Sequence, residues 1–114
     1  MTRGKVVLVP LPFDDLSVVK VRPAVCLTDP IGPYRHVILA FISSQIPLDS
    51  LETGLVLDSS QADFSTTGLR VSSTLRLHRL MTVTTALIRR ELGALSPYMQ
   101  AEMANKLRNL FGLT

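Results

Sequence analysis

Short apolar runs, each bounded by turn-forming residues, fill the first 95 positions of the chain. The runs are rich in β-branched side chains, and several alternate apolar with polar positions, which is typical of strands. We expect strands over residues 4–13, 22–28, 36–45, 53–58, 69–83 and 89–95. The third run is the most continuously apolar, so we place it near the centre of a sheet. Residues 69–83 form either one bent strand or two.

The end of the chain follows a helical period instead. Ser96 is a good N-cap and Pro97 suits the first helical position, so a helix is expected from there to about Leu110, followed by Gly112. Its two faces separate into core positions and outward positions. The core positions are Met99, Met103, Leu107, Leu110 and Phe111, and the outward positions are Glu102, Lys106 and Arg108.

This order of elements predicts the fold class. Many short strands followed by one helix indicate a mainly β (α+β) fold, namely a small β-barrel or curled sheet closed by a C-terminal helix. The length of 114 residues predicts a single domain over residues 1–114. Hydrophobic residues make up 46% of the chain, and this suggests that a partner covers some apolar surface.

Several features of the sequence favour a cytoplasmic protein that does not enter a membrane. The longest apolar run is well short of the roughly 18 residues that a spanning helix needs, and it contains two prolines. The first residues have no signal-peptide pattern, because strand-like sequence starts almost at once. The only cysteine, Cys26, lies inside an apolar run, where we expect a buried hydrophobe in a reducing compartment.

The net charge and its distribution weakly favour a protein that binds nucleic acid. The net charge is +3, and residues 44–63 contain four acids and no base. Five arginines fall within some twenty residues further on, namely Arg70, Arg76, Arg79, Arg89 and Arg90. This asymmetry fits a protein with one basic face, although ordinary surface charge explains it about as well.

Common catalytic motifs are absent. No Gly-rich loop follows a strand, His36 and His78 with one cysteine give no metal-ligand spacing, and no nucleophile elbow is present. We therefore expect no metal and no cofactor. One stretch still asks for an explanation: in KVRPAVCLT, Lys20 and Arg22 stand on one side of the chain where an apolar strand begins. They are either solvated edge residues or ligands for a phosphate.

Four segments, in this order, resemble the MazF/PemK family of toxins. They are GKVVLVPLPFDDLSVVKVRPAVCLT, FISSQI, GLRVSSTLRLHRL and LGALSPYMQAEMANKLRNLFGL. The resemblance covers nearly the whole chain. It implies a compact SH3-like barrel, a homodimer, and the toxin of a type II toxin–antitoxin system that arrests growth. The implied activity is metal-independent, sequence-specific cleavage of single-stranded RNA, and the implied partner is a small antitoxin with a disordered tail.

The resemblance also implies site residues. Arg22 matches the arginine of the family's Arg-Pro motif and would face the scissile phosphate, for which its planar fork is suited. Ser43 matches the hydroxyl residue of the family's Ile-Ser/Thr-x-Gln motif, two positions before Gln45, and would hydrogen-bond the phosphate or help proton transfer. Ser44 is the alternative if the alignment shifts, and Gln45 is a further possible phosphate contact. Arg76 matches an arginine of an Arg-x-Asp pattern, but His78 stands in the Asp position.

This departure leaves the acid–base assignment open. Arg76 and His78 would share one face of a regular strand, and His78 is either a proton-transfer group or an ordinary surface residue. In the first loop, Ser17 and Lys20 are candidates for contacts to backbone phosphates. Arg89 and Arg90 either line an RNA groove or, as we favour, solubilise an edge strand. Two other functions remain: a CcdB-like toxin that binds a topoisomerase, and a module on the same fold that binds RNA or protein without cutting.

Overall fold

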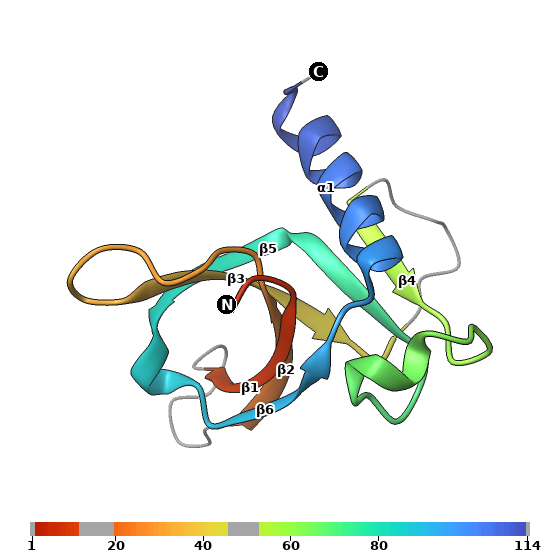
Figure 1. Cartoon of the computed structure of the whole chain (residues 1–114), viewed down its shortest axis with the longest axis horizontal. Helices are drawn as coiled ribbons and strands as arrows, with labels where there is room; N and C mark the ends of the chain where they lie inside the picture. Colours follow the sequence, from red (N-terminus) through yellow and green to blue (C-terminus); the bar gives the residue numbers. More distant parts are fainter. Residues whose placement is uncertain (1, 12–19, 46–52, 114) are drawn as a thin grey trace.

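The computed structural model describes residues 2–11, 20–45 and 53–113. It contains six strands, two short 3-10 helices and one α-helix (Figure 1). The strands are β1 (Lys5–Leu11), β2 (Lys20–Cys26), β3 (His36–Ser43), β4 (Gly54–Leu57), β5 (Ser73–Thr84) and β6 (Arg90–Ala94). The helices are η1 (Phe64–Thr67), η2 (Thr85–Leu87) and α1 (Pro97–Phe111).

All pairings in the sheet are antiparallel, and the strand order is β4-β5-β3-β2-β1-β6. The sheet curls into a half-barrel, with α1 packed beside β4 and β5 (Figure 1). This confirms the predicted mainly β class with a C-terminal helix, and the interior position of the third strand. Where one strand or two were expected over residues 69–83, the structure has the single long strand β5, which begins at Ser73 and ends at Thr84. The segments between β4 and β5 and between β5 and β6 contain η1 and η2, respectively.

The helix is fixed at both ends by the residues that predicted it. The Ser96 hydroxyl accepts a hydrogen bond from the Met99 N–H at 3.1 Å, and Gly112 ends the helix in a left-handed conformation with φ 68°. The Ser96 hydroxyl also donates to the carboxylate of Asp63, which ties the helix start to the segment before η1. Among the described residues no helix is long and apolar enough to cross a membrane.

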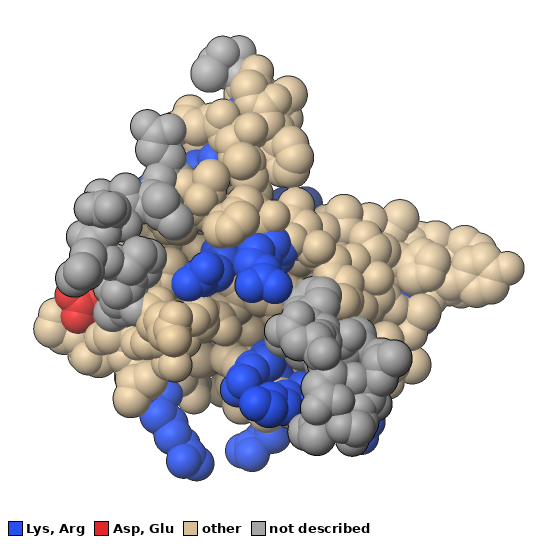
Figure 2. All heavy atoms as spheres, turned by 180° about the vertical axis from the view of Figure 1, so that it is seen from behind, with Lys and Arg blue, Asp and Glu red and all other residues tan. Residues whose placement is uncertain are grey.

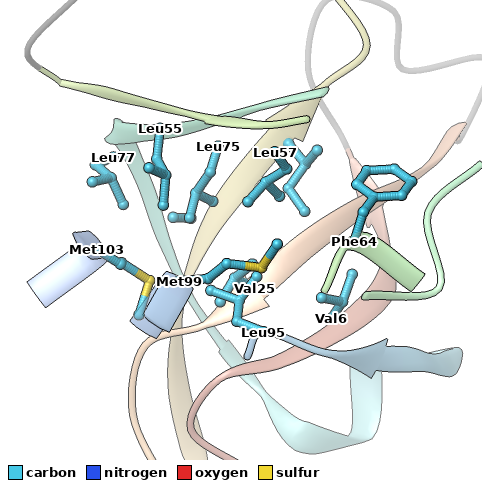
Figure 3. Packing of buried hydrophobic residues seen from close by; sticks show 12 residues of the cluster. Val6, Val25, Leu55, Leu57, Phe64, Leu75, Leu77, Leu95, Met99 and Met103 are labelled. Atoms are coloured by element: carbon cyan, nitrogen blue, oxygen red, sulfur yellow. The ribbon is translucent and has the colours of Figure 1, made fainter. Parts of the chain in front are cut away.

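Two apolar clusters lie on opposite faces of the curled sheet, because side chains alternate along each strand. The first lies between the sheet and α1, where Met99 and Met103 meet side chains of β4 and β5 (Figure 3). The second lies on the other face and includes Ala24, Cys26 and Phe41.

One predicted core position of the helix is wrong. Phe111 is 57% exposed, because the last turn of α1 extends beyond the sheet that covers the earlier turns (Figure 1). Of the positions expected to face outward, Arg108 is exposed, whereas Glu102 and Lys106 are partly buried.

We predict that Cys26 behaves as an inert core thiol. Burial raises its pKa from 9.0 to about 11. The folded state therefore holds this proton more tightly than the unfolded chain, and the associated stability is lost as pH rises from about 9 towards 11. The urea midpoint of the wild type should fall more between pH 8 and pH 10.5 than that of Cys26→Ala. Rapid reaction of the native thiol with Ellman's reagent at pH 8 would contradict this.

We also predict that Gly93 is needed for the contact between β6 and η1. A Cβ atom at this position would lie 2.3 Å from the backbone oxygen of Thr66, so the two segments would have to separate. Gly93→Ala should lower the free energy of unfolding by about 1–3 kcal/mol, as overpacking commonly does. Denaturant titration measures this free energy, and a variant as stable as the wild type would contradict the prediction.

Candidate functional site

The candidate site is a groove that opens where β2 and β3 part. Their pairing runs from Cys26 and Leu39 to Ala24 and Phe41 and goes no further. The next residue of β2 is Pro23, which has no N–H to donate to a neighbouring strand. On its other edge β2 stays paired with β1 as far as Lys20, so its first residues are held in place beside the gap.

The groove has a volume of about 840 Å³. Residues from five strands and two connecting segments surround it. The polar and charged lining residues include Arg22, Ser43, Ser44, Gln45, Arg70, Arg76, Arg79 and Arg90. The other lining residues include Leu8, Pro23, Phe41, Gly68, Leu69, Val71 and Leu92.

Three predicted site residues, Arg22, Ser43 and Arg76, project from the same face of the sheet. Ala24 and Phe41 pair directly, and both point into the second apolar cluster. Arg22 and Ser43 lie two residues beyond them on β2 and β3, so strand alternation puts their side chains on that face. Arg76 pairs with Phe41 from the opposite strand and shares the face too. The three polar side chains therefore lie on the face of the second apolar cluster, and all three line the groove.

The Ser43 hydroxyl is held by the turn that follows β3. It accepts a hydrogen bond from the Gln45 N–H at 3.1 Å. Its own O–H remains able to donate into the groove, which Ser44 and Gln45 also line. Ser43 and Ser44, the two alternatives at the end of β3, therefore both line the groove.

His78 does not line the groove, although it was expected to share one face of the strand with Arg76. Between the pairs Phe41–Arg76 and Ala40–Leu80, β5 has three extra residues. On its other edge β5 stays in register with β4 as far as Leu77, whose N–H donates to the oxygen of Thr53 at 2.8 Å, and Leu75 and Leu77 both lie in the first apolar cluster. The extra residues therefore disturb the alternation only after Leu77. As a result Arg79 lines the groove with Arg76, whereas His78 is exposed and is not among the lining residues.

The far wall of the groove is set by close backbone packing. At Gly68, with φ 73°, an added Cβ would lie 2.1 Å from the backbone oxygen of Leu92 in β6. This contact brings the segment that carries Arg70 against the strand that carries Arg90, and both arginines line the groove. Arg90 therefore departs from the favoured role of solubilising an edge strand. Arg89 is exposed and does not line the groove.

Positive charge dominates the groove. Its lining includes five arginines, at positions 22, 70, 76, 79 and 90, and among the described residues it includes no Asp, Glu or His. Figure 2 shows Lys and Arg side chains gathered over the middle and one edge of the molecule seen from behind, with acidic atoms only at the margin. Converging guanidinium groups bind phosphate oxygens strongly and remain charged at every physiological pH.

Two buried polar atoms lie in or beside the groove without a hydrogen-bond partner, namely Nε of Arg76 and Oγ1 of Thr74. Thr74 is 3% exposed and lies directly opposite Ser43. No sequence pattern singled out Thr74, because its place opposite Ser43 depends on the pairing of strands that are far apart in the chain.

The remaining predicted contacts lie elsewhere. Lys20 begins β2 and is exposed, but it does not line the groove. Ser17 lies outside the described residues. In the part of the chain that the structure describes, no cluster of three or more His, Cys, Asp or Glu side chains is placed to hold a metal ion.

Comparison with solved structures identifies the same fold in bacterial toxins. Toxin MazF-mt6 of Mycobacterium tuberculosis superposes with a TM-score of 0.72 at 21% identity, covering 96% of this chain and 98% of that one. An endoribonuclease in complex with its cognate antitoxin, from mycobacterial species, gives 0.74 at 14% identity, with 100% and 97% covered. MazF of Deinococcus radiodurans gives 0.69 at 17% identity, with 99% and 97% covered.

These identities establish the shared fold. A comparison with curated proteins finds no match. The family model described as PemK-like, MazF-like toxin of type II toxin–antitoxin system matches residues 2–111. The chain therefore belongs to the PemK-like, MazF-like toxin family.

Proposed function

We propose that this toxin is an endoribonuclease that cuts single-stranded RNA, such as mRNA, at a specific sequence and without a metal ion. The observation that carries the proposal is the convergence of Arg22, Ser43 and Arg76 on one face of a groove lined by five arginines. The family and the related endoribonuclease fold support it.

The proposed reaction is attack of the ribose 2′-oxygen on the neighbouring phosphorus. The new 2′-O–P bond forms as the P–O5′ bond breaks, and the electron pair of that bond leaves with the 5′-oxygen. Water takes the proton of the 2′-hydroxyl, and the 5′-oxygen takes up a proton from water. Negative charge grows on the phosphoryl oxygens, where Arg22 and Arg76 stabilise it and the Ser43 hydroxyl donates a hydrogen bond. The products are a 2′,3′-cyclic phosphate and a 5′-hydroxyl.

The described lining contributes charge stabilisation rather than general base catalysis, because it contains no carboxylate or imidazole. We assign His78 no step in the reaction, since it is exposed outside the groove. Arg70, Arg79 and Arg90 extend the positive surface beyond the three central residues, and they would hold phosphates that flank the cut.

The proposed partners follow from the family and from exposed surface. A related endoribonuclease is described in complex with its cognate antitoxin, so we propose an antitoxin partner in the cytoplasm for this chain too. Several large apolar side chains stay exposed on the single chain, including Tyr34, Tyr98 and Leu113. Apolar surface of this kind is commonly covered by a partner, which supports a homodimer.

A second candidate is a toxin or module on the same fold that binds RNA or a protein target without cutting. It is favoured by one observation, namely that no carboxylate or imidazole lines the described groove. The cleavage experiment below separates the two functions.

The first prediction concerns Arg22. Arg22→Ala should reduce the cleavage rate of a long single-stranded RNA in EDTA by about 100-fold or more, because a charge-stabilising group of the transition state is lost. Its melting temperature should stay the same, since Arg22 is exposed. Arg89→Ala removes an exposed arginine outside the groove and should cut like the wild type. Intact RNA with wild-type protein, or equal loss in both variants, would contradict the proposal.

The second prediction concerns assembly. Sedimentation at micromolar concentration should give twice the chain mass of 12.5 kDa, because association buries apolar side chains that one chain leaves in water. A species of 12.5 kDa would contradict the homodimer.

A further inference from the structure

Thr74 and Arg76 carry the only buried side-chain polar atoms without a hydrogen-bond partner in the part of the chain that the structure describes. Such atoms are rare in folded proteins, because burial removes the water that would otherwise bind them. These two lie two residues apart on β5, and one of them belongs to a residue that lines the groove. Two unpartnered atoms so close together in one strand indicate that the two side chains act together.

Strand geometry puts the two side chains on the same face of β5. Residues two apart on a strand are separated by roughly 6.6 Å, and an arginine side chain is long enough to bring its Nε across that distance. Thr74 lies opposite Ser43, and Arg76 lies opposite Phe41. The buried threonine therefore stands two positions from Arg76 on the same face of β5, although it does not itself line the groove.

The two orphaned atoms are chemically complementary. Arginine Nε carries a single N–H and can only donate, whereas the threonine oxygen can accept. Since Nε is buried while the residue lines the groove, the guanidinium presents its two terminal amino groups to a ligand. Two parallel hydrogen bonds to an anion require a fixed orientation of the guanidinium plane. A hydrogen-bond acceptor for Nε–H, on the side away from the anion, would hold that orientation.

We propose that Thr74 is a positioning residue: when a phosphate binds the terminal amino groups of Arg76, the Thr74 hydroxyl accepts the hydrogen bond of Arg76 Nε–H, directly or through one water. The proposal rests on the proposed function in one respect, namely that the natural anion is a phosphate of RNA. The hydrogen bond increases the affinity of the groove for phosphate, and it adds nothing to the stability of the free protein.

A second buried threonine provides a matched comparison. Thr67 is fully buried, and its hydroxyl donates to the oxygen of Phe64 at 2.7 Å and accepts from the Leu69 N–H at 3.1 Å. Removing this paired hydroxyl in Thr67→Val should lower the melting temperature. Removing the unpaired hydroxyl in Thr74→Val, at nearly constant volume, should leave the melting temperature unchanged or raise it.

The test is the affinity for inorganic phosphate, measured by NMR titration of the arginine Nε–H signals at constant ionic strength. Thr74→Val should weaken phosphate binding at least about threefold, and Thr74→Ser, which keeps the hydroxyl, should bind like the wild type. In an Arg76→Lys background, which lacks Nε–H, Thr74→Val should have no further effect. Thr74→Ala also lacks the hydroxyl and takes the place of Thr74→Val if that variant does not fold.

Two results would overturn the proposal: equal phosphate affinity of Thr74→Val and wild type, or the same weakening in the Arg76→Lys background. RNA cleavage is measured separately with the same proteins. A Thr74-dependent phosphate affinity in a protein that cuts no RNA would support the positioning role while rejecting the proposed function.

Discussion

The interruption of pairing between β2 and β3 at Pro23 is the constraint on which the site depends. Beyond Ala24 and Phe41 the two strands no longer share hydrogen bonds, and the space between them becomes the groove. Because β1 still holds the other edge of β2, Arg22 is fixed at the border of this space rather than left on a loose end. Pro23, which has no backbone N–H to donate, thus ends the pairing of β2 with β3 while β2 stays paired with β1.

The same end of the sheet differs energetically from the rest. The two apolar clusters stabilise the curled sheet and anchor α1, and the ion pair between Lys5 and Glu91, at 3.3 Å, lies outside the groove. The groove instead gathers like charges and leaves the Arg76 Nε unpaired. Such an arrangement weakens the free protein slightly and strengthens binding of a polyanion, which is the balance expected of a functional site.

Local sequence signals were enough to predict most of the elements. Ser96 and Pro97 fixed the start of α1, and the apolar run of β3 placed it inside the sheet. Arg22 lines the groove, and the expectation that it faces a phosphate, which came from the family resemblance, stays a prediction. Local alternation did not indicate Arg79: β5 has three extra residues between Arg76 and Leu80, and Arg79 lines the groove whereas His78 does not.

That shift illustrates why the rest of the site could not be predicted. Register is decided by pairing between strands that are distant in sequence, so neither the bulge nor the neighbours of Thr74 can be read from a local pattern. The packing of Gly68 against β6, which makes Arg70 and Arg90 part of one groove, has the same long-range origin.

The central claim is that the groove promotes attack of a ribose 2′-hydroxyl on the adjacent phosphate. Mass spectrometry of the ends of a single-stranded RNA incubated with the protein tests it most directly. The account predicts 2′,3′-cyclic phosphate and 5′-hydroxyl ends at a short recurring sequence. Ends with a 3′-hydroxyl and a 5′-phosphate, or RNA that stays intact, would contradict it.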